Sequence, residues 1–279
     1  MTVRIDGKAV AARVRTDVAD QVADLPDQPG LATVLVGDDP ASAVYVAGKR
    51  RAVVAAGMRD VHRALPADVT QDRVAQVLDE LAADPAVSGI LLQLPLPAGL
   101  DAPALLDRIP PGKDVDGLTT VSAGLLARGE PGLRPCTPSG VLGLLDDAGV
   151  ALRGVHAVVV GRSALVGRPM GHLLLQRDAS VTIVHRHSLH VPAITREADV
   201  LVVAAGVPGL IGRADVKEGA AVVDVGIHRT PAGLTGDVRT EELQGHAGWV
   251  TPVPGGVGPM TIAMLLSNTL DAARTAARR

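Results

Sequence analysis

A tyrosine and a lysine four residues apart, Tyr45 and Lys49, are the residues of this chain best suited to proton transfer. On a helix, side chains at i and i+4 share one face, so the phenol and the ammonium would lie together. A partly buried lysine loses its proton more readily than a solvated one and can act near neutral pH. The alternative is a surface lysine that follows a packed tyrosine. Short-chain dehydrogenases use the same spacing, but after their nucleotide-binding turn, whereas this pair lies far upstream of any such turn.

Two further polar sites follow apolar segments. Gln93 ends the run GILLQ and precedes a proline-stiffened loop, 94–97. It is therefore expected at the carboxyl edge of a sheet, where open α/β folds bind ligands, unless it only terminates a strand. The segment KDVDG (113–117) holds the carboxylates Asp114 and Asp116. These form either a simple turn or an acceptor for the paired N–H groups of an amino-pyrimidine type of ring.

A glycine-containing turn follows the apolar run HAVVV (156–160), in the segment GRSALVGRPM (161–170). Gly161, Ser163 and Gly167 would lie where a strand meets a helix, and backbone N–H groups there can hold a phosphate. The spacing is neither the G-x-G-x-x-G fingerprint nor a Walker motif, so a plain turn is the alternative.

The charges around this turn favour NADP over NAD. Arg186 follows the next predicted strand, at the place where a NAD-specific protein usually has an acidic residue. With Arg162 in the first turn, and with Ser163 and Ser188, it would suit a 2′-phosphate. Three histidines occur in the same segment, but without the helical H-x-x-x-H spacing or paired cysteines of a metal site. We expect no metal at His185, His187 and His190.

The run TPVPGGVGPMT (251–261) has no ordinary packing role, because three prolines and three glycines crowd into residues 252–259. Such a run is incompatible with the interior of a helix or of a central strand. Its glycines let the main chain approach a ligand closely. An apolar helical pattern follows, so the run is predicted to be a ligand-contacting loop ahead of the last helix. A tight connection between a strand and that helix is the alternative.

Composition limits the classes of protein. The chain has 279 residues, which suit two domains, and 47% of them are hydrophobic. Phe is absent, so the cores must be built from Val, Leu, Ile and Ala. A net charge of −3 without a long basic run argues against nucleic-acid binding. The apolar stretches are too short for a membrane span, and the sequence has no signal-peptide pattern. Its single cysteine, Cys136, excludes an intramolecular disulfide. We therefore expect a soluble cytosolic protein without disulfides or a membrane partner.

Apolar runs alternate with amphipathic segments nearly throughout, which predicts an α/β fold with parallel, doubly wound sheets. Runs without polar alternation are expected where both faces of a sheet are covered. The expected strands are 31–36, 89–93, 156–160, 180–184, 199–204 and 220–225, and the expected helices include 10–25, 43–56, 71–83, 137–148 and 260–276.

The domain boundary is predicted near residue 137. Thr137 and Pro138 there have the pattern of an N-cap followed by a first helical position. Residues 1–137 would form one α/β domain and residues 138–259 another. The last helix, within 260–279, is expected to pack back on the first domain.

Six blocks occur in order over essentially the whole chain: YVAGKRRA (45–52), LLQLPLP (91–97), KDVDG (113–117), RPCTPSG (134–140), GRSALVGRPM (161–170) and TPVPGGVGPMT (251–261). Together they closely resemble the bifunctional methylenetetrahydrofolate dehydrogenase/methenyltetrahydrofolate cyclohydrolase family, the FolD-type enzymes. Any one block alone would be poor support. The resemblance implies NADP-dependent oxidation of 5,10-methylenetetrahydrofolate to the 5,10-methenyl cation, then hydrolysis to 10-formyltetrahydrofolate.

The family pattern also implies roles for single residues. Lys49 would be the catalytic residue that handles protons around the attacking water, and Tyr45 would stack on or position the folate. Gln93 would tune the protonation of Lys49, and Asp116 would hold the pterin ring. The substrate would further contact Pro254, Gly255 and Gly256, and the dinucleotide would contact Thr137, Gly161, Arg162, Ser163, Val166, Arg186 and Ile227.

The resemblance further implies a catalytic folate-binding domain over 1–137, a Rossmann-like NADP-binding domain over 138–259, and an active site in the cleft between them. It implies a cytoplasmic homodimer in tetrahydrofolate interconversion and purine biosynthesis, without the formate ligase of trifunctional relatives. Gly48, in the helix turn that carries the tyrosine–lysine pair, costs about 1 kcal/mol relative to alanine and should move neither side chain. His228 has no assigned role.

Two other functions stay open. A monofunctional dehydrogenase that prefers NAD is disfavoured by the two arginines and by the presence of Lys49 with Gln93. A catalytically silent dinucleotide-binding protein on the same fold would be expected to have lost Lys49, Gln93 or Asp116, and all three are present.

Overall fold

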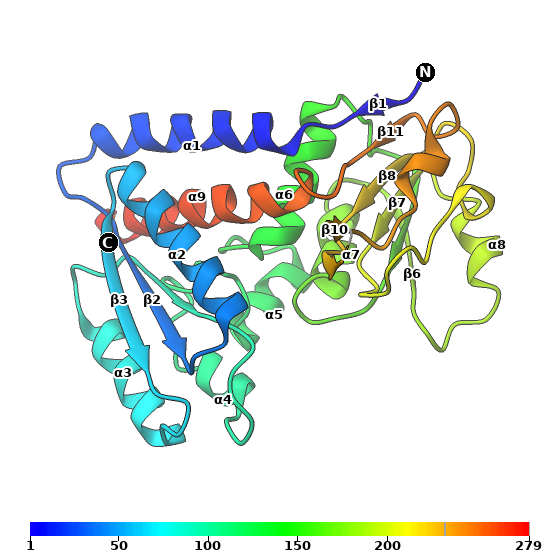
Figure 1. Ribbon diagram of the computed structural model, residues 1–279. Coiled ribbons are helices and arrows are strands. Elements are labelled where there is room, and N and C mark those ends of the chain that lie inside the picture. The colour runs from blue at the N-terminus through cyan, green and yellow to red at the C-terminus, as the bar shows by residue number, and fades with distance from the viewer. Residues whose placement is uncertain (232, 279) are drawn as a thin grey trace. The chain divides into compact units, whose positions relative to one another are not determined.

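A computed structural model of the chain describes residues 1–231 and 233–278. The chain forms two compact units (Figure 1). Unit 1 consists of Met1–Ala12 and Thr137–Thr261, and unit 2 consists of Arg13–Cys136 with the residues from Ile262 onward. The segment Met1–Ala12, which the sequence groups with the first domain, therefore lies in unit 1. The chain passes from one unit to the other three times.

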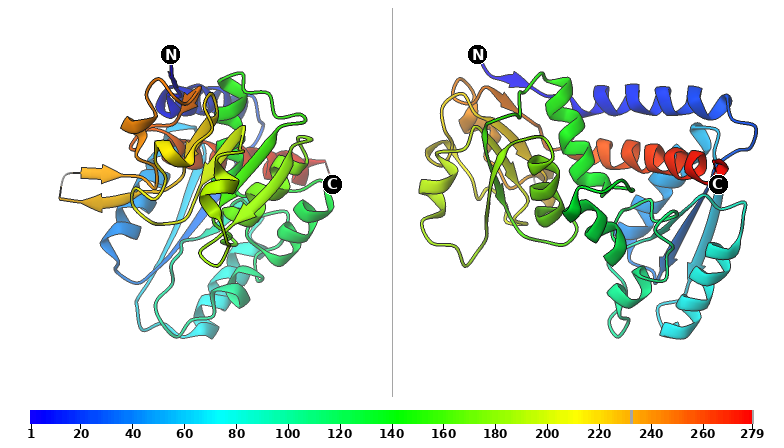
Figure 2. Two further views of the ribbon diagram at one scale, coloured as in Figure 1. Left: turned by 90° about the vertical axis from the view of Figure 1, so that its right-hand side faces the viewer. Right: turned by 180° about the vertical axis from the view of Figure 1, so that it is seen from behind.

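Unit 1 is built on a six-stranded sheet in the order β1-β11-β8-β7-β5-β6, in which neighbouring strands run parallel. A separate antiparallel hairpin of β9 and β10 extends away from this sheet (Figure 2, left). The strands are β1 (Val3–Arg4), β5 (His156–Val160), β6 (Ser180–Val184), β7 (Val200–Val203), β8 (Ala221–Asp224), β9 (His228–Thr230), β10 (Gly233–Thr235) and β11 (Trp249–Val250). The helical elements are α6 (Cys136–Asp147), α7 (Gly167–Leu175), α8 (Val191–Thr195), η1 (Arg213–Asp215) and η2 (Thr240–Leu243).

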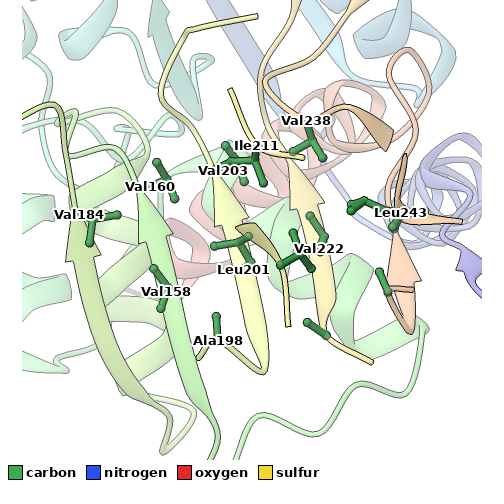
Figure 3. Packing of buried hydrophobic residues seen from close by; sticks show 14 residues of the cluster. Val158, Val160, Val184, Ala198, Leu201, Val203, Ile211, Val222, Val238 and Leu243 are labelled. Carbon is green, nitrogen blue, oxygen red and sulfur yellow. The ribbon is translucent and has the colours of Figure 1, made fainter. Parts of the chain in front are cut away.

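The core of unit 1 is made of small branched side chains. Val158, Leu201 and Val222 come from three neighbouring strands and pack beside one another over the sheet (Figure 3). Each is at most 1% exposed. Dense packing of β-branched residues on a pleated surface supplies the apolar burial that a chain without Phe cannot take from aromatic rings.

Unit 2 holds a three-stranded parallel sheet in the order β3-β2-β4. The strands are β2 (Gly30–Val36), β3 (Arg59–Leu65) and β4 (Gly89–Leu92). The helices are α2 (Pro40–Ala55), α3 (Gln71–Ala83), α4 (Ala102–Leu106) and α5 (Thr120–Arg128), joined by the later parts of α1 (Gly7–Ala23) and α9 (Val257–Ala277). Helices α1 and α9 run side by side (Figure 1), and within unit 2 Val18 and Val22 share a buried cluster with Leu265 and Leu266.

The predicted α/β class with parallel sheets is confirmed, and each predicted strand coincides with a strand of one of the two sheets. The sequence pattern did not predict β3, which reads RDVHRAL and is half-buried. This strand lies at the edge of its sheet, where charged side chains are tolerated and the apolar pattern is lost. Among the described helices, none is long and apolar enough to cross a membrane.

Two predicted helix starts are wrong. Helix α6 begins at Cys136, so Thr137 is a helical residue rather than the N-cap, and Pro138 lies in the first turn. Helix α9 begins at Val257, inside the run predicted to be a loop, and includes Pro259. The reason is the same in both cases. N–H groups in the first turn of a helix have no partner within the helix, so proline is tolerated there.

Candidate active site

Helix α2 positions the tyrosine–lysine pair. Its N-cap is Asp39, whose carboxylate accepts a hydrogen bond from the Ser42 backbone N–H at 2.8 Å. Val46 and Val53 anchor the buried face of the helix. Lys49 lies on that side too and is only 5% exposed. Its Nζ lies 5.0 Å from the centroid of the Tyr45 ring, so the two side chains share one face, as their spacing predicts.

Gln93 joins this pair from the end of β4. Its Oε1 accepts a hydrogen bond from Lys49 Nζ at 3.1 Å. Its Nε2 donates to the Leu94 backbone carbonyl at 2.5 Å, which fixes the orientation of the amide and leaves the oxygen facing the lysine. Gln93, at the strand end predicted from GILLQ, thus provides a hydrogen-bond acceptor for the buried ammonium of Lys49.

Asp116 completes the charge balance of this cluster. Burial lowers the pKa of Lys49, and the charge of Asp116 opposes that shift. Burial raises the pKa of Asp116, and Lys49 opposes that shift in turn. Each group therefore holds the other partly in its charged form, and the proton of Lys49 is released more easily than that of a solvated lysine.

The two carboxylates of KDVDG have different roles. Asp114 is 1% exposed and accepts hydrogen bonds from the backbone N–H groups of Leu118 and Thr119, at 3.2 and 2.9 Å. It is the turn-forming residue that the sequence left as one possibility. Asp116 is the carboxylate coupled electrostatically to Lys49. The turn needs Gly117, because its φ is +67° and an added Cβ would lie 2.5 Å from the Pro135 nitrogen.

Cys136 belongs to the same cluster, although the sequence gave no sign of it. Its Sγ donates to the Val115 carbonyl at 3.2 Å, and burial raises the pKa of its thiol well above the usual value. Asp116 adds to that shift and Lys49 opposes it, so the thiol lies within electrostatic reach of both.

In unit 1 the turn after β5 is shaped by two glycines. Gly161 has φ +123°, and a Cβ there would lie 2.2 Å from the Ala204 carbonyl oxygen. A Cβ on Gly167 would lie 2.2 Å from the Gly161 carbonyl oxygen. The Ser163 hydroxyl accepts hydrogen bonds from the N–H groups of Val166 and Gly167, at 3.1 and 3.3 Å, so its own proton stays available to an acceptor. This is a tightly packed strand-to-helix turn of the kind that holds phosphates.

The two predicted arginines lie at one edge of the sheet. Arg162 follows β5 and Arg186 follows β6, and these strands are parallel neighbours with Val160 opposite Val184. Both arginines are exposed, and Arg186 donates to His187 Nε2 at 3.1 Å. In residues 1–231 and 233–278, no group of three or more metal-ligating side chains is arranged to hold an ion.

A second part of unit 1 gathers the remaining predicted residues except Thr137. Ile227 lines a cavity of about 180 Å³ together with Pro254, Gly255 and Gly256. The sequence did not predict that Lys8 and Asp224 also line this cavity. Thr137 is not among the lining residues. Its hydroxyl instead lies 3.0 Å from that of Thr261.

The structure therefore groups the predicted residues into three sets. The lysine cluster of unit 2 is formed by Tyr45, Lys49, Gln93 and Asp116. In unit 1, one set surrounds the turn after β5 and the neighbouring Arg186, and the other lines the cavity beside Ile227. A buried lysine cluster and a glycine-shaped phosphate turn define an α/β dinucleotide-dependent enzyme.

The chain belongs to the tetrahydrofolate dehydrogenase/cyclohydrolase family. The catalytic domain of that family matches residues 5–116, and its NAD(P)-binding domain matches residues 135–277. The recognition of this family from the six sequence blocks is thereby confirmed.

Relatives and solved structures agree with this assignment. The bifunctional protein FolD 2 of Frankia casuarinae is 67% identical over 98% of this chain and 96% of its own length. The FolD methylenetetrahydrofolate dehydrogenase/cyclohydrolase of Campylobacter jejuni has a TM-score of 0.97 at 40% identity, covering 99% of this chain and 100% of that one. The Trypanosoma brucei dehydrogenase-cyclohydrolase, in complex with NADP and an inhibitor, has a TM-score of 0.95 at 39% identity and covers 100% and 99% of the two chains.

Proposed function

We propose that this protein oxidises 5,10-methylenetetrahydrofolate with NADP and hydrolyses the resulting 5,10-methenyl cation to 10-formyltetrahydrofolate. The observation that carries this proposal is the buried Lys49, held by Gln93 Oε1 at 3.1 Å and balanced by Asp116. Family membership supports both steps, because the family is that of tetrahydrofolate dehydrogenase/cyclohydrolase and the Campylobacter jejuni enzyme is named as bifunctional in both activities.

The first step is a hydride transfer. The bridging carbon of the substrate loses hydrogen with its electron pair, and the products are the methenyl cation and NADPH. Bound NADP supplies the hydride acceptor. The chain fits this dinucleotide, since Gly161 and Gly167 let the turn after β5 pack tightly against neighbouring backbone, in a strand-to-helix turn of the kind whose N–H groups bind phosphate. Arg162 and Arg186 would pair with the 2′-phosphate and give the preference for NADP.

The second step consumes water and releases one proton. Water adds to the cationic carbon and loses one proton. The remaining hydroxyl proton passes to the leaving ring nitrogen as its bond to this carbon breaks, and the formyl group stays on the second nitrogen. Lys49 in its neutral form would take the proton from the attacking water. Burial, which lowers its pKa, makes that form accessible. Gln93 would hold the amine in position.

The substrate contacts are proposed on the residues that the family pattern assigns to the folate. Tyr45 presents its ring beside Lys49 and would stack on the folate. The Asp116 carboxylate would accept hydrogen bonds from the N–H groups of the pterin. From unit 1, Pro254, Gly255 and Gly256 would contact the folate through the cavity that they line with Ile227.

The test is an absorbance progress curve with 5,10-methylenetetrahydrofolate and either NADP or NAD, followed by acid quenching. Acid converts the 10-formyl product back to the methenyl cation, so the signals before and after quenching separate the two steps. We expect NADPH to exceed the methenyl signal before quenching and to match it afterwards, once spontaneous hydrolysis is subtracted. A persistent stoichiometric methenyl signal would mean a dehydrogenase alone, and no reduced nucleotide would mean a silent binding protein.

We also infer that the protein is a cytoplasmic homodimer whose 10-formyl product serves purine biosynthesis. Family membership supports this inference. Sedimentation equilibrium should give twice the mass of the chain, and fractionation of the source cells should recover the protein with the cytoplasmic enzymes. A monomeric mass at micromolar concentration would contradict the dimer.

A further inference from the structure

Two buried aspartates tie together the loops at the carboxyl ends of β7 and β8. The Asp224 carboxylate, at the end of β8, accepts hydrogen bonds from the backbone N–H groups of Gly226, Asp237 and Val238 at 2.9 to 3.0 Å. Asp237 follows β10 and accepts from the N–H groups of Ala205 and Gly206, at 2.7 and 2.8 Å. Three chain segments that are distant in sequence are thus fixed by two carboxylates.

His228 is the side chain that pairs with the buried Asp237 carboxylate. Its Nε2 lies 2.6 Å from Asp237 Oδ1. The Asp237 side chain is 0% exposed and the His228 side chain 20% exposed. Across the described residues, no other side chain hydrogen-bonds Asp237. A buried carboxylate is costly unless it is paired, and Asp224 brings a second negative charge close to it.

The pair acts on a backbone with little freedom. A Cβ on Gly226 would lie 2.3 Å from Asp237 Oδ1, so the chain before Ile227 is held directly against the carboxylate. Asp237 also accepts a hydrogen bond from the Ala205 N–H. The preceding residue, Ala204, has the carbonyl that packs against Gly161. One set of contacts therefore connects His228 with the turn after β5 and with Ile227.

We propose that His228 is a positioning residue for the dinucleotide. By donating to Asp237 it fixes the turn at 225–227 and the turn at Ala205 and Gly206, which adjoin the proposed dinucleotide contacts Ile227 and Gly161. This inference rests on the proposed function, because it concerns the same dinucleotide. His228 contacts neither substrate nor cofactor in this role, and it acts through Asp237.

The test uses His228→Leu and His228→Gln. Leucine removes the donor, whereas the glutamine amide reaches as far as Nε2 and can still donate to Asp237. We expect His228→Leu to raise the Kd for NADP, measured by calorimetry, and the KM for NADP by about tenfold. The kcat at saturating NADP and the hydrolysis of 5,10-methenyltetrahydrofolate should change by less than about twofold, because no interaction specific to the transition state is lost. His228→Gln should restore most of the affinity.

A matched control is His246→Leu. His246 Nε2 lies 2.8 Å from the Val216 carbonyl in the same unit, so this variant also loses a histidine hydrogen bond, but one away from the dinucleotide turns. It should lower the melting temperature without changing the Kd for NADP. An unchanged Kd in His228→Leu would overturn the proposal. The proposal would also be overturned if His228→Leu lost both activities in proportion to a loss of folded protein. A wild-type protein that neither binds nor reduces NADP would instead refute the function itself.

Discussion

Lys49 Nζ lies 3.1 Å from Gln93 Oε1, and this contact joins a helix and a strand end that are more than forty residues apart in sequence. The lysine is 5% exposed, so the amide replaces water as an acceptor for its ammonium. Burial nevertheless lowers the pKa of Lys49. The amide therefore holds the amine in place without adding the charge that would keep it permanently protonated.

Replacing Lys49 with arginine should separate the two proposed activities. A guanidinium does not give up its proton in a protein, so it cannot accept one from the attacking water. We expect Lys49→Arg to lower the cyclohydrolase rate at least about 100-fold while sparing part of the dehydrogenase rate. Hydrolysis of 5,10-methenyltetrahydrofolate and reduction of NADP are measured on the same preparation.

The control for this variant is Lys113→Arg. Lys113 donates to the carbonyls of Ala82 and Asp84, both at 2.8 Å, rather than to Gln93. Both activities should survive that change. Cyclohydrolase activity retained in Lys49→Arg would remove Lys49 from the proposed chemistry.

Replacing Gln93 with glutamate should move the pH dependence of hydrolysis. A carboxylate at this distance favours the ammonium form, so the pKa of Lys49 rises toward its ordinary value. If neutral Lys49 takes the proton, activity increases as pH rises through that pKa. The increase in kcat for the cyclohydrolase step should therefore shift to higher pH in Gln93→Glu, with a lower rate at neutral pH. Asp116→Asn, which removes a negative charge, should shift the profile in the opposite direction. A Gln93→Glu profile that stays in place or moves to lower pH would refute this role of Lys49.

The parallel sheets and the shared face of Tyr45 and Lys49 were predictable, because both follow from local periodicity. The contact of Lys49 with Gln93 was not predictable from spacing, since it depends on how α2 crosses the end of β4. Cys136, as a single cysteine, predicted only the absence of an intramolecular disulfide, although its thiol interacts electrostatically with Lys49 and Asp116. The role of His228 was not predictable from the sequence either, because its contact with Asp237 forms only when the hairpin of β9 and β10 folds.

The preference for NADP should depend on the two arginines. Arg162→Ala and Arg186→Ala each remove a guanidinium proposed to pair with the 2′-phosphate, so each should raise the KM for NADP by about tenfold or more. The KM for NAD, which has no such phosphate, should change little. Arg153→Ala is the control, because that exposed arginine pairs with Asp178 instead. Equal losses for NADP and NAD would place the arginines elsewhere on the dinucleotide.

The buried carboxylate of Asp224 should make stability depend on pH. Burial raises its pKa from 3.8 to about 6, with a smaller contribution from the charge of Asp237. The folded state therefore binds this proton more tightly than the unfolded state, and this group's contribution to stability is lost as pH rises from about 4 to about 6. Urea unfolding should show the free energy of unfolding of the wild type falling relative to Asp224→Asn over that range. A constant or growing difference would contradict the shifted pKa.

Two glycine substitutions should have opposite effects on stability. At Gly48, in the middle of α2, an added Cβ meets nothing within 4 Å. Gly48→Ala should therefore raise the free energy of unfolding by about 0.5 to 1 kcal/mol and leave both activities intact. At Gly161, φ is +123° and the Cβ would lie 2.2 Å from the Ala204 oxygen. Gly161→Ala should cost about 2 kcal/mol or more and weaken NADP binding.

The control for Gly161 is Gly233, which has φ +120° and open space around its Cβ position. Gly233→Ala measures the cost of this positive φ alone, so the excess cost at Gly161 reports the close approach to the Ala204 carbonyl. Chemical denaturation gives the free energies, and calorimetry gives the affinity for NADP. Equal costs at the two positions, with NADP affinity unchanged in Gly161→Ala, would show that the turn after β5 can widen without consequence for the dinucleotide.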